Sequence, residues 1–315
     1  MDRIIIGADL GGTQMRVARF NPALDLLDRW AEPTLAHEGP DRVIPRLLDL
    51  IARAMPDDPS VVLGVGVSGP GPINPRTGII VAPPNLPGWH NVPLRSIVEE
   101  RFGCPVYLGN DANVAALAET THGAAQGYTH VIYVTVSTGI GSGVIDEGRL
   151  VIGAEGLGAE AGHMVMLVGD RVSTLEKEAA GPAIARKAIA RLQAGATSII
   201  TERVSDLNEI TAKVVGEAAA KGDAFAIEQI AEAGRLVGLG LVTLMHLFNP
   251  QVIVVGGGVT KTGDLLFEPM RAAVREYVLD QSYCEHVPII PPALGDNVAL
   301  IGAAALVTTK GGSYL

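Results

Sequence analysis

Two glycine-containing segments carry groups suited to binding phosphate. The first reads Asp-Leu-Gly-Gly-Thr and covers residues 9–13. Gly11 and Gly12 let backbone N–H groups approach phosphate oxygens without a Cβ in the way, and Thr13 adds a hydroxyl donor. Asp9 is suited to hold magnesium through water, because this ion keeps much of its hydration shell. A plain β-hairpin turn is the alternative interpretation of so short a motif.

The second segment reads Ser-Thr-Gly-Ile-Gly-Ser-Gly, residues 137–143, and repeats this chemistry through Thr138 and Gly139. Two such turns, each between two strands, could clamp one polyphosphate. Gly257 and Gly258 follow a third predicted strand and offer a flat backbone surface to an adenine or ribose. The alternative for this glycine pair is close packing between a strand and a helix. Neither a Walker motif nor a dinucleotide fingerprint is found in the sequence.

Asp111 follows a predicted strand and precedes a predicted helix, and two roles are open to it. As a helix N-cap, it would accept hydrogen bonds from backbone amides. As a general base, it would take a proton from an attacking hydroxyl, which typically contributes a factor of about 10² to 10⁴ in rate. The neighbouring Asn110 favours the second role, because an amide both donates to and accepts from polyol hydroxyls.

A further polar group surrounds the segment Gly-Leu-Gly-Ala-Glu-Ala-Gly-His-Met, where Glu160 and His163 lie three residues apart and Glu176 follows. Two carboxylates and an imidazole suit a polyol, whereas a metal site made of the same three residues is the alternative. The segment Pro-Asn-Leu-Pro-Gly-Trp could bring Asn85 to the same ligand while Trp89 packs beneath the loop. A polyproline surface loop is the alternative there.

The elements that must position these residues alternate between β and α. Strands are expected at residues 3–9, 15–20, 61–67, 106–108, 130–136, 144–146 and 252–255. Helices are expected at residues 41–55, 92–102, 182–193, 207–220, 224–248, 265–279 and 298–309. Strand, glycine-rich turn and strand thus occur twice, once near the start of each half, which indicates a weak internal repeat.

The 315 residues are enough for two lobes, each with its own core. We expect a first lobe of residues 1–112 with the C-terminal helix 298–315, and a second lobe of residues 113–297. The composition of 48% apolar residues, 4% aromatic residues and 38 glycines suits an α/β protein. A net charge of −10 opposes general affinity for nucleic acid or acidic membranes, so we expect neither as a partner.

The two cysteines, Cys104 and Cys284, exclude a framework of several disulfides, and reduced thiols are expected. The N-terminus shows no long apolar segment followed by a cleavage site. The most apolar stretch, residues 236–248, is too short to span a bilayer and predicts a buried helix. These features predict a cytoplasmic protein.

Several motifs, in this order along nearly the whole chain, resemble the ROK sugar kinases of the actin/hexokinase superfamily, whose fold is ribonuclease H-like and duplicated, with two lobes around a central cleft. They are DLGGT, GVSGPGPI, PNLPGW, GNDAN, TVSTGIGSG, GAEGLGAEAGHM, AAGPAIAR, NPQVIVVGGGV and GDNVALIGAA. The resemblance implies that ATP phosphates are held by Asp9, Gly11, Gly12, Thr13, Thr138 and Gly139, with Gly257 and Gly258 near the nucleoside. It also implies Asp111 as the catalytic base, and Asn85, Asn110, Asp111, Glu160, His163 and Glu176 as ligands of the sugar.

One departure from the family concerns zinc. Many members carry a cysteine-rich segment whose thiolates bind zinc together with the histidine of the Gly-His-Met step. Here residues 164–175 read MVMLVGDRVSTL and contain no cysteine. We therefore expect no structural zinc and a His163 that serves the sugar alone. Its orientation must then come from packing around Met164, Met166 and Leu175, because metal ligation normally fixes an imidazole ring.

The resemblance implies an ATP- and magnesium-dependent hexose kinase of carbohydrate metabolism, with glucose as the first choice, as in glycolysis. Fructose, mannose, allose, N-acetylmannosamine and N-acetylglucosamine remain open as substrates, as does polyphosphate as donor. A non-catalytic sugar sensor and a chaperone-like or filament-forming ATPase are the alternatives from other classes. Family repressors place a helix-turn-helix domain before DLGGT, and only eight residues precede Asp9 here. A homodimer or homotetramer is expected from the family.

Overall fold

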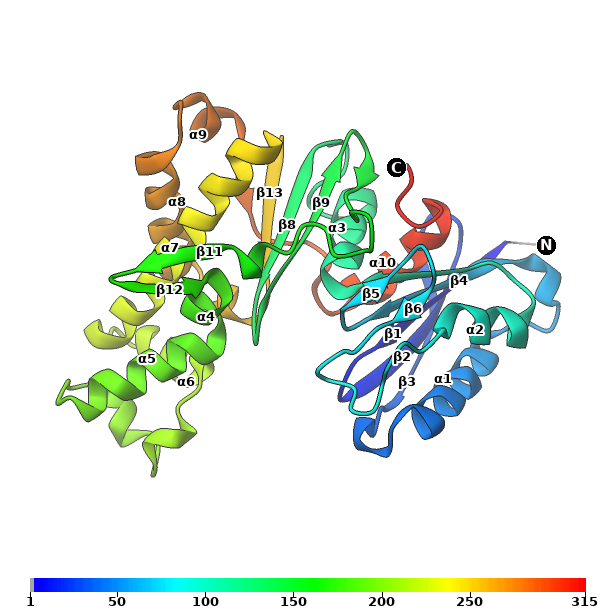
Figure 1. Ribbon diagram of the computed structural model, residues 1–315, viewed down its shortest axis with the longest axis horizontal. Coiled ribbons are helices and arrows are strands. Elements are labelled where there is room, and N and C mark those ends of the chain that lie inside the picture. The colour runs from blue at the N-terminus through cyan, green and yellow to red at the C-terminus, as the bar shows by residue number, and fades with distance from the viewer. Residues whose placement is uncertain (1–2) are drawn as a thin grey trace. The chain divides into compact units, whose positions relative to one another are not determined.

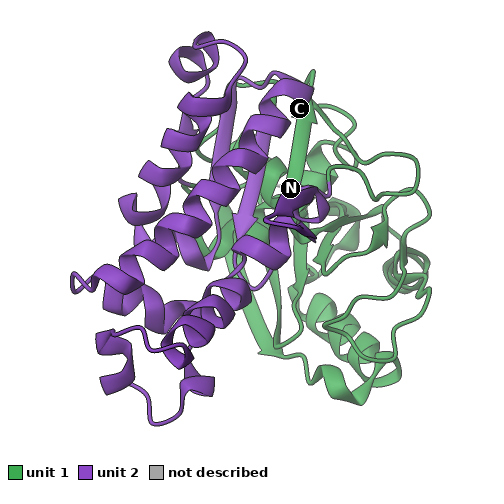
Figure 2. Cartoon of the chain, turned by 60° about the vertical axis from the view of Figure 1, so that its left-hand side comes forward, with its two compact units in different colours: residues 1–131, 143–159, 292–315 green, residues 132–142, 160–291 purple. Residues whose placement is uncertain are grey.

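The computed structural model describes residues 3–315 and divides them into two compact units (Figure 2). Unit 1 contains the described residues up to 131 together with 143–159 and 292–315, and unit 2 contains 132–142 and 160–291. The described part of the predicted first lobe thus lies in unit 1, with residues 113–131, 143–159 and 292–297 in addition. The lobe boundaries at residues 112 and 297 stay a prediction.

Unit 1 is built on a mixed five-stranded sheet with the order β3-β2-β1-β4-β7 (Figure 1). Its strands are β1 (Ile4–Leu10), β2 (Gln14–Phe20), β3 (Leu26–Pro33), β4 (Val62–Gly69) and β7 (Val106–Asn110). Strands β1, β2 and β3 are joined antiparallel, whereas β4 and β7 continue parallel to β1. The parallel strands therefore end at the same edge of the sheet.

The second five-stranded sheet has the order β10-β9-β8-β13-β14. Its strands are β8 (Val131–Val136), β9 (Ile140–Asp146), β10 (Arg149–Leu150), β13 (Val252–Gly256) and β14 (Ile289–Ile290). Numbered within each sheet, both orders are 3-2-1-4-5. This repetition confirms the predicted duplication, although the sequences of the two halves share little beyond their glycine turns.

The helices of unit 1 are α1 (Pro40–Ala54), α2 (Leu94–Phe102), α3 (Asp111–His122) and α10 (Val298–Thr308). Those of unit 2 are α4 (Leu175–Ala179), α5 (Gly181–Gln193), α6 (Ala212–Ala219), α7 (Ala224–Phe248), α8 (Asp264–Tyr277) and α9 (Ser282–His286). Two short hairpins complete the chain, β5 (Ile73–Asn74) with β6 (Ile79–Ile80), and β11 (Val165–Val168) with β12 (Arg171–Thr174). Helix α7 is apolar and long enough to cross a membrane, but 61% of its most apolar window is buried within the protein.

The sheet of unit 1 is covered on both faces. Helix α1 brings Val43, Leu47 and Ile51 into a core that also contains Ile6 and Leu10 of β1. Successive residues of a strand point to opposite faces, so Gly7 faces the other side. There α10 lies so close that an ideal Cβ on Gly7 would be 2.6 Å from the carbonyl oxygen of Leu300.

The structure differs from the sequence prediction in several places. Strand β3 was not expected, because most of its residues are exposed and show no alternation. The hairpin β11–β12 and the short helix α4 were also not expected. Asn110, rather than Asp111, is the N-cap of α3, and its Oδ1 accepts a hydrogen bond of 2.8 Å from the amide of Asn113. The N-cap alternative for Asp111 is therefore wrong, because Asp111 is the first helical residue.

We predict that Gly66→Ala destabilises the protein strongly, whereas Gly69→Ala on the same strand does not. An ideal Cβ on Gly66 would lie 1.7 Å from the carbonyl oxygen of Ala303, so α10 would have to move. At Gly69 the nearest atom is the Cδ1 of Ile73 at 3.5 Å, an ordinary contact. Urea denaturation should show a loss of about 3 kcal/mol for Gly66→Ala, at the upper end of typical overpacking costs. Equal midpoints for the two variants would contradict this account of the α10 contact.

Candidate active site

The predicted site residues fall into two groups, one in each unit. Unit 1 contains Asp9, Gly11, Gly12, Thr13, Asn85, Asn110 and Asp111. Unit 2 contains Thr138, Gly139, Glu160, His163, Glu176, Gly257 and Gly258. Each group is described within its own unit.

The register of three parallel strands brings the acidic residues of unit 1 together. Asp9 on β1 pairs with Ser68 on β4, and the next residue of β4 pairs with Asn110 at the end of β7. Asp111 follows directly as the first residue of α3. The carboxyl ends of parallel strands are where open α/β sheets bind ligands, so this edge is the natural place for a site.

Asp111 has the electrostatics of a base that can exchange protons near neutral pH. Solvent reaches its side chain, yet the surrounding protein removes part of its hydration. This desolvation, followed by repulsion from Asp9, raises the pKa of Asp111 to about 6, while a hydrogen bond from Ser68 opposes the rise. The Ser68 Oγ donates to Oδ1 of Asp111 at 3.3 Å.

Asp9 is buried and bound to Arg16, which faces it across the β1–β2 hairpin. Burial raises the pKa of Asp9, and the Arg16 charge and hydrogen bonds lower it in part. Both hydrogen bonds from Arg16, through Nε at 2.8 Å and an Nη at 2.5 Å, end on Oδ2. Within the described residues Oδ1 accepts no hydrogen bond, so it is available to a water in the hydration shell of a magnesium ion. The donor chemistry at Asp9 therefore fits magnesium held through water.

The first glycine turn is a β-hairpin turn that also has the features of a phosphate-binding loop. The Gly11 amide donates to the Gln14 carbonyl at 3.1 Å and so closes the β1–β2 hairpin. The amides of Gly12 and Thr13 are therefore the ones in this turn that could bind a ligand. An ideal Cβ on Gly12 would lie 3.1 Å from the carbonyl oxygen of Asn85. The turn and the predicted sugar ligand Asn85 are thus neighbours. Trp89 is fully buried beneath the same loop, as the sequence predicts.

In unit 2 the turn at residues 137–139 is fixed from two sides. The Gly181 amide at the start of α5 donates to the Ser137 carbonyl at 2.8 Å. The Ile140 amide donates to Oε2 of Glu176 at 2.9 Å. An ideal Cβ on Gly139 would be 2.6 Å from the same Oε2, so a side chain at this position would displace the carboxylate from the turn. Glu176, predicted as a sugar ligand, therefore also supports the predicted phosphate turn.

The other predicted residues of unit 2 are held near that turn. Gly257 has φ 96° and packs so closely on Val136 that an ideal Cβ would be 2.4 Å from its carbonyl oxygen. Ser142 Oγ accepts a hydrogen bond of 3.0 Å from the Ala161 amide, which fixes the turn that carries Glu160 and His163. Burial and the neighbouring Glu176 raise the pKa of Glu160, whereas His163 lowers it. Glu160 therefore lies within electrostatic range of both His163 and Glu176.

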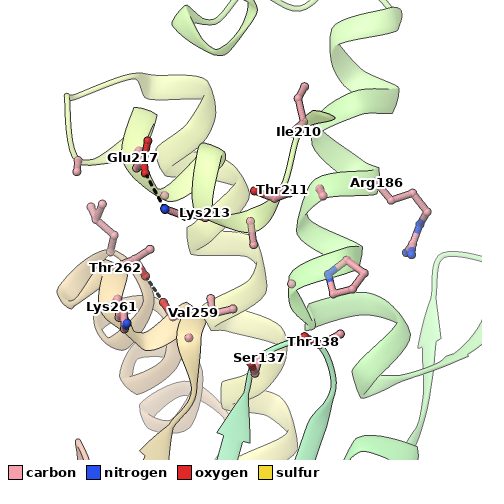
Figure 3. A pocket seen from close by; sticks show the side chains of 18 of the residues that line it. Ser137, Thr138, Arg186, Ile210, Thr211, Lys213, Glu217, Val259, Lys261 and Thr262 are labelled. Atoms are coloured by element: carbon pink, nitrogen blue, oxygen red, sulfur yellow. Dashed lines mark hydrogen bonds and ion pairs between the residues drawn. The ribbon is translucent and has the colours of Figure 1, made fainter. Parts of the chain in front are cut away.

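A cavity of about 1060 Å³ opens in unit 2 beside Thr138 and Gly258 (Figure 3). Its walls come from α5, α6 and the segment after β13, and they are largely apolar. Among the residues that line it, Arg186, Lys213 and Lys261 are basic. The Nζ of Lys213 lies 3.9 Å from Oε1 of Glu217, and Arg186 donates to the Lys177 carbonyl. Within residues 3–315 the side chain of Lys261 makes no ion pair or hydrogen bond. The volume and lining suit a nucleoside, and the glycine turns at its edge suit phosphates.

Sequence reasoning missed several residues of these sites. Ser68 lies within the motif GVSGPGPI, and the buried strand before it was the available signal. Arg16 lies opposite Asp9 in the β1–β2 register, so the hairpin predicted around the glycine turn was the available signal. Lys261 and the walls of the cavity gave no signal, because they come from helices far apart in the chain. Within residues 3–315 no three His, Cys, Asp or Glu side chains converge as metal ligands, so the alternative metal set of Glu160, His163 and Glu176 is not formed.

The duplicated sheet and the glycine turns define an α/β protein of the actin/hexokinase-like class. A family model described as the ROK family matches residues 5–310, and the chain belongs to this family. It is 31% identical to a glucokinase of Thermotoga maritima, over 97% of this chain and 98% of the relative. It is also 29% identical to a putative xylose repressor of Caldicellulosiruptor, over 96% of this chain and 78% of that protein.

Two solved structures are similar along nearly the whole chain. A ROK hexokinase from Thermus thermophilus has a TM-score of 0.79 and 35% identity, with 96% of this chain and 97% of the other covered. A ROK family glucokinase from Streptomyces griseus, in complex with glucose and AMPPNP, has a TM-score of 0.79 and 31% identity, with 96% and 98% covered. These neighbours confirm the predicted fold class and support a ROK sugar kinase.

We predict that the Asp111 carboxyl titrates near pH 6 and that Ser68→Ala moves this value upward. The hydrogen bond from Ser68 stabilises the ionised form, so its loss favours the protonated one. Carbon-13 NMR of protein labelled at aspartate would follow the titration, with Asp111→Asn to assign the signal. A wild-type pKa near 4, or a downward move in Ser68→Ala, would contradict the desolvated environment of Asp111.

Proposed function

We propose that this protein is an ATP-dependent hexose kinase that transfers the γ-phosphate to a sugar hydroxyl, with glucose converted to glucose 6-phosphate. One observation carries the proposal. Asp111 is a solvent-accessible carboxylate with a raised pKa, and it lies at the same edge of the sheet as Asp9, where the parallel strands end. The similarity to glucokinases over the whole length supports it. Kinases of other hexoses, named above, are the alternatives within the class.

The residues divide the work as follows. Asp111 accepts the proton of the attacking sugar hydroxyl, and its pKa of about 6 keeps it ionised at neutral pH. Asn85, Asn110, Glu160, His163 and Glu176 hold the remaining hydroxyls. The amides of Gly12 and Thr13 and the turn with Thr138 and Gly139 hold phosphates, while Gly257 and Gly258 border the nucleoside cavity. ATP bound with magnesium supplies the electrophilic phosphoryl group, and Asp9 holds the ion through water.

The apolar cavity favours ATP over polyphosphate as donor. A polyphosphate chain offers nothing to its aliphatic walls, whereas a purine buries its faces there. The absence of structural zinc, a cytoplasmic location and a homodimer or homotetramer remain parts of the proposal.

A non-catalytic sugar sensor is the second candidate, because the chain also resembles xylose repressors over 96% of its length. A coupled assay of ADP release with about ten sugars, with ATP or polyphosphate as donor, separates the candidates. We expect ADP release only when a hexose is present, with glucose giving the highest kcat/KM. Sugar binding in calorimetry without ADP release would instead establish a sensor, and sugar-independent release would indicate an ATPase.

Asp111→Asn should lower kcat by at least about 10², the range for a lost general base, while the protein stays folded. In the wild type, kcat/KM for the hexose should fall as the pH drops below about 6, because the carboxyl becomes protonated there. The melting temperature of the variant at pH 8 should not be lower, since the substitution removes a desolvated charge next to Asp9. Near-normal turnover in Asp111→Asn would place the base elsewhere.

Lys261→Ala should raise the KM for ATP about tenfold and leave the KM for the hexose unchanged. Lys261 lines the cavity and has no partner among the described residues, so a nucleotide oxygen would gain a charge-assisted hydrogen bond from it. Such a bond corresponds to about tenfold or more in affinity. Lys221→Ala is the matched control, because this exposed lysine does not line the cavity. Equal effects of the two substitutions would show that only general charge is involved.

A further inference from the structure

The hairpin β11–β12 lies in the chain between two of the proposed hexose ligands. His163 precedes it by two residues and Glu176 follows it by two. At its base the Leu175 amide donates to the Met164 carbonyl at 3.0 Å, so the neighbours of both ligands are joined directly. The placement of His163 relative to Glu176 therefore depends on what holds this hairpin.

Apolar packing holds only the base. Met164 and Leu175 pack on Gly240 of α7, where an ideal Cβ would lie 2.7 Å from Leu175 and 3.1 Å from Met164. Further out, Val165, Leu167 and Val172 are 71–77% exposed, so these side chains contribute little burial. Apolar contacts alone thus leave the outer hairpin weakly attached.

A buried carboxylate supplies the missing attachment. Glu178 on α4 is 1% exposed, and its Oε1 accepts hydrogen bonds from Ser173 Oγ at 2.7 Å and from Arg171 at 2.9 Å. Both donors belong to β12. On the other side Lys187 of α5 places its Nζ 3.2 Å from Oε2, and the same Nζ donates to Glu232 of α7 at 2.8 Å. Glu178 therefore ties the hairpin to two helices.

The charge of Glu178 is well compensated. Burial opposes its ionisation, but hydrogen bonds from Ser173 and Arg171 and the nearby charge of Lys187 outweigh this and lower the pKa to about 2. The carboxylate lies just beneath the surface, since the Arg171 that covers it is 63% exposed. Loss of the charge would weaken the interactions that Ser173 and Lys187 make with a buried group, which costs more than the loss of an exposed ion pair.

We propose that Glu178 is a positioning residue that holds the β11–β12 hairpin, and through it His163 and Glu176, in the geometry that binds the hexose. This inference rests on the proposed function. In this proposal the ion pairs around Glu178 orient the hairpin. A bound metal would have that role in a segment that contains cysteines. The alternative is that Glu178 contributes to stability alone.

Glu178→Gln tests the proposal, with Glu232→Gln as the matched control that removes only the exposed partner of Lys187. We expect Glu178→Gln to raise the KM for the hexose about tenfold, which is typical of the loss of hydrogen bonds to a charged group. The KM for ATP should stay within about twofold of the wild-type value. Backbone amides of residues 165–174 should exchange hydrogen about tenfold faster, because local opening becomes easier. Ser173→Ala should act in the same direction and serves if Glu178→Gln does not fold.

Two results would overturn the inference. One is a lower melting temperature with a reduced kcat and an unchanged KM for the hexose, which indicates a smaller folded fraction. The other is normal exchange of the hairpin amides in Glu178→Gln. Absence of hexose-dependent ADP release in the wild type would overturn the proposed function instead, and the exchange experiment distinguishes this failure because it does not depend on turnover.

Discussion

The pairing of three parallel strands, β1, β4 and β7, is the constraint on which the chemistry of unit 1 depends. It sets Asp9 opposite Ser68 and brings Asn110 to the same edge. A slip of one residue would turn these side chains to the opposite face of the sheet. Register is secured by burial on both faces, with α1 packed on one side and α10 against glycines on the other. The raised pKa of Asp111 is thus a consequence of backbone pairing as well as of its own environment.

In unit 2 the equivalent constraint is the support beneath a glycine turn. Glu176 and the start of α5 hold residues 137–139, and a side chain added at 139 would displace the Glu176 carboxylate. The open side of the turn meets a cavity with largely apolar walls, lined also by Lys261, which has no partner in the described part of the chain. A net charge of −10 gives the protein no general attraction for a polyanion. Under the proposed function, local amides and Lys261 would therefore have to provide it.

Much of this architecture could be predicted from the sequence. Buried strands and amphipathic helices have clear periodicities, and the glycine turns marked both repeats. Strand β3 escaped prediction because an edge strand with exposed residues has no alternation to detect. The β11–β12 hairpin escaped because its apolar residues face solvent. The N-cap of α3 is Asn110 and not Asp111. Asparagine and aspartate are both good N-cap residues, so their types alone do not show at which of the two the helical backbone begins.

The site was predictable only in part, for a related reason. Asp9, Asp111 and the glycines lie in contiguous motifs, whereas Ser68, Arg16 and Lys261 gain their meaning from partners distant in the chain. Glu178 shows this most clearly. Its sequence neighbours suggest an exposed helical residue, but three donors from two elements surround it.

The hydrogen bond between Glu176 and the Ile140 amide has a thermodynamic consequence. The two oxygens of a carboxylate rotate as one rigid group, so the bond to Oε2 also sets the direction of Oε1. A sugar bound at Oε1 and a phosphate bound on the turn would select the same side-chain rotamer. Linkage then requires that each ligand change the affinity of the other by an equal factor. Synergy between the two substrates would follow from one shared torsion angle.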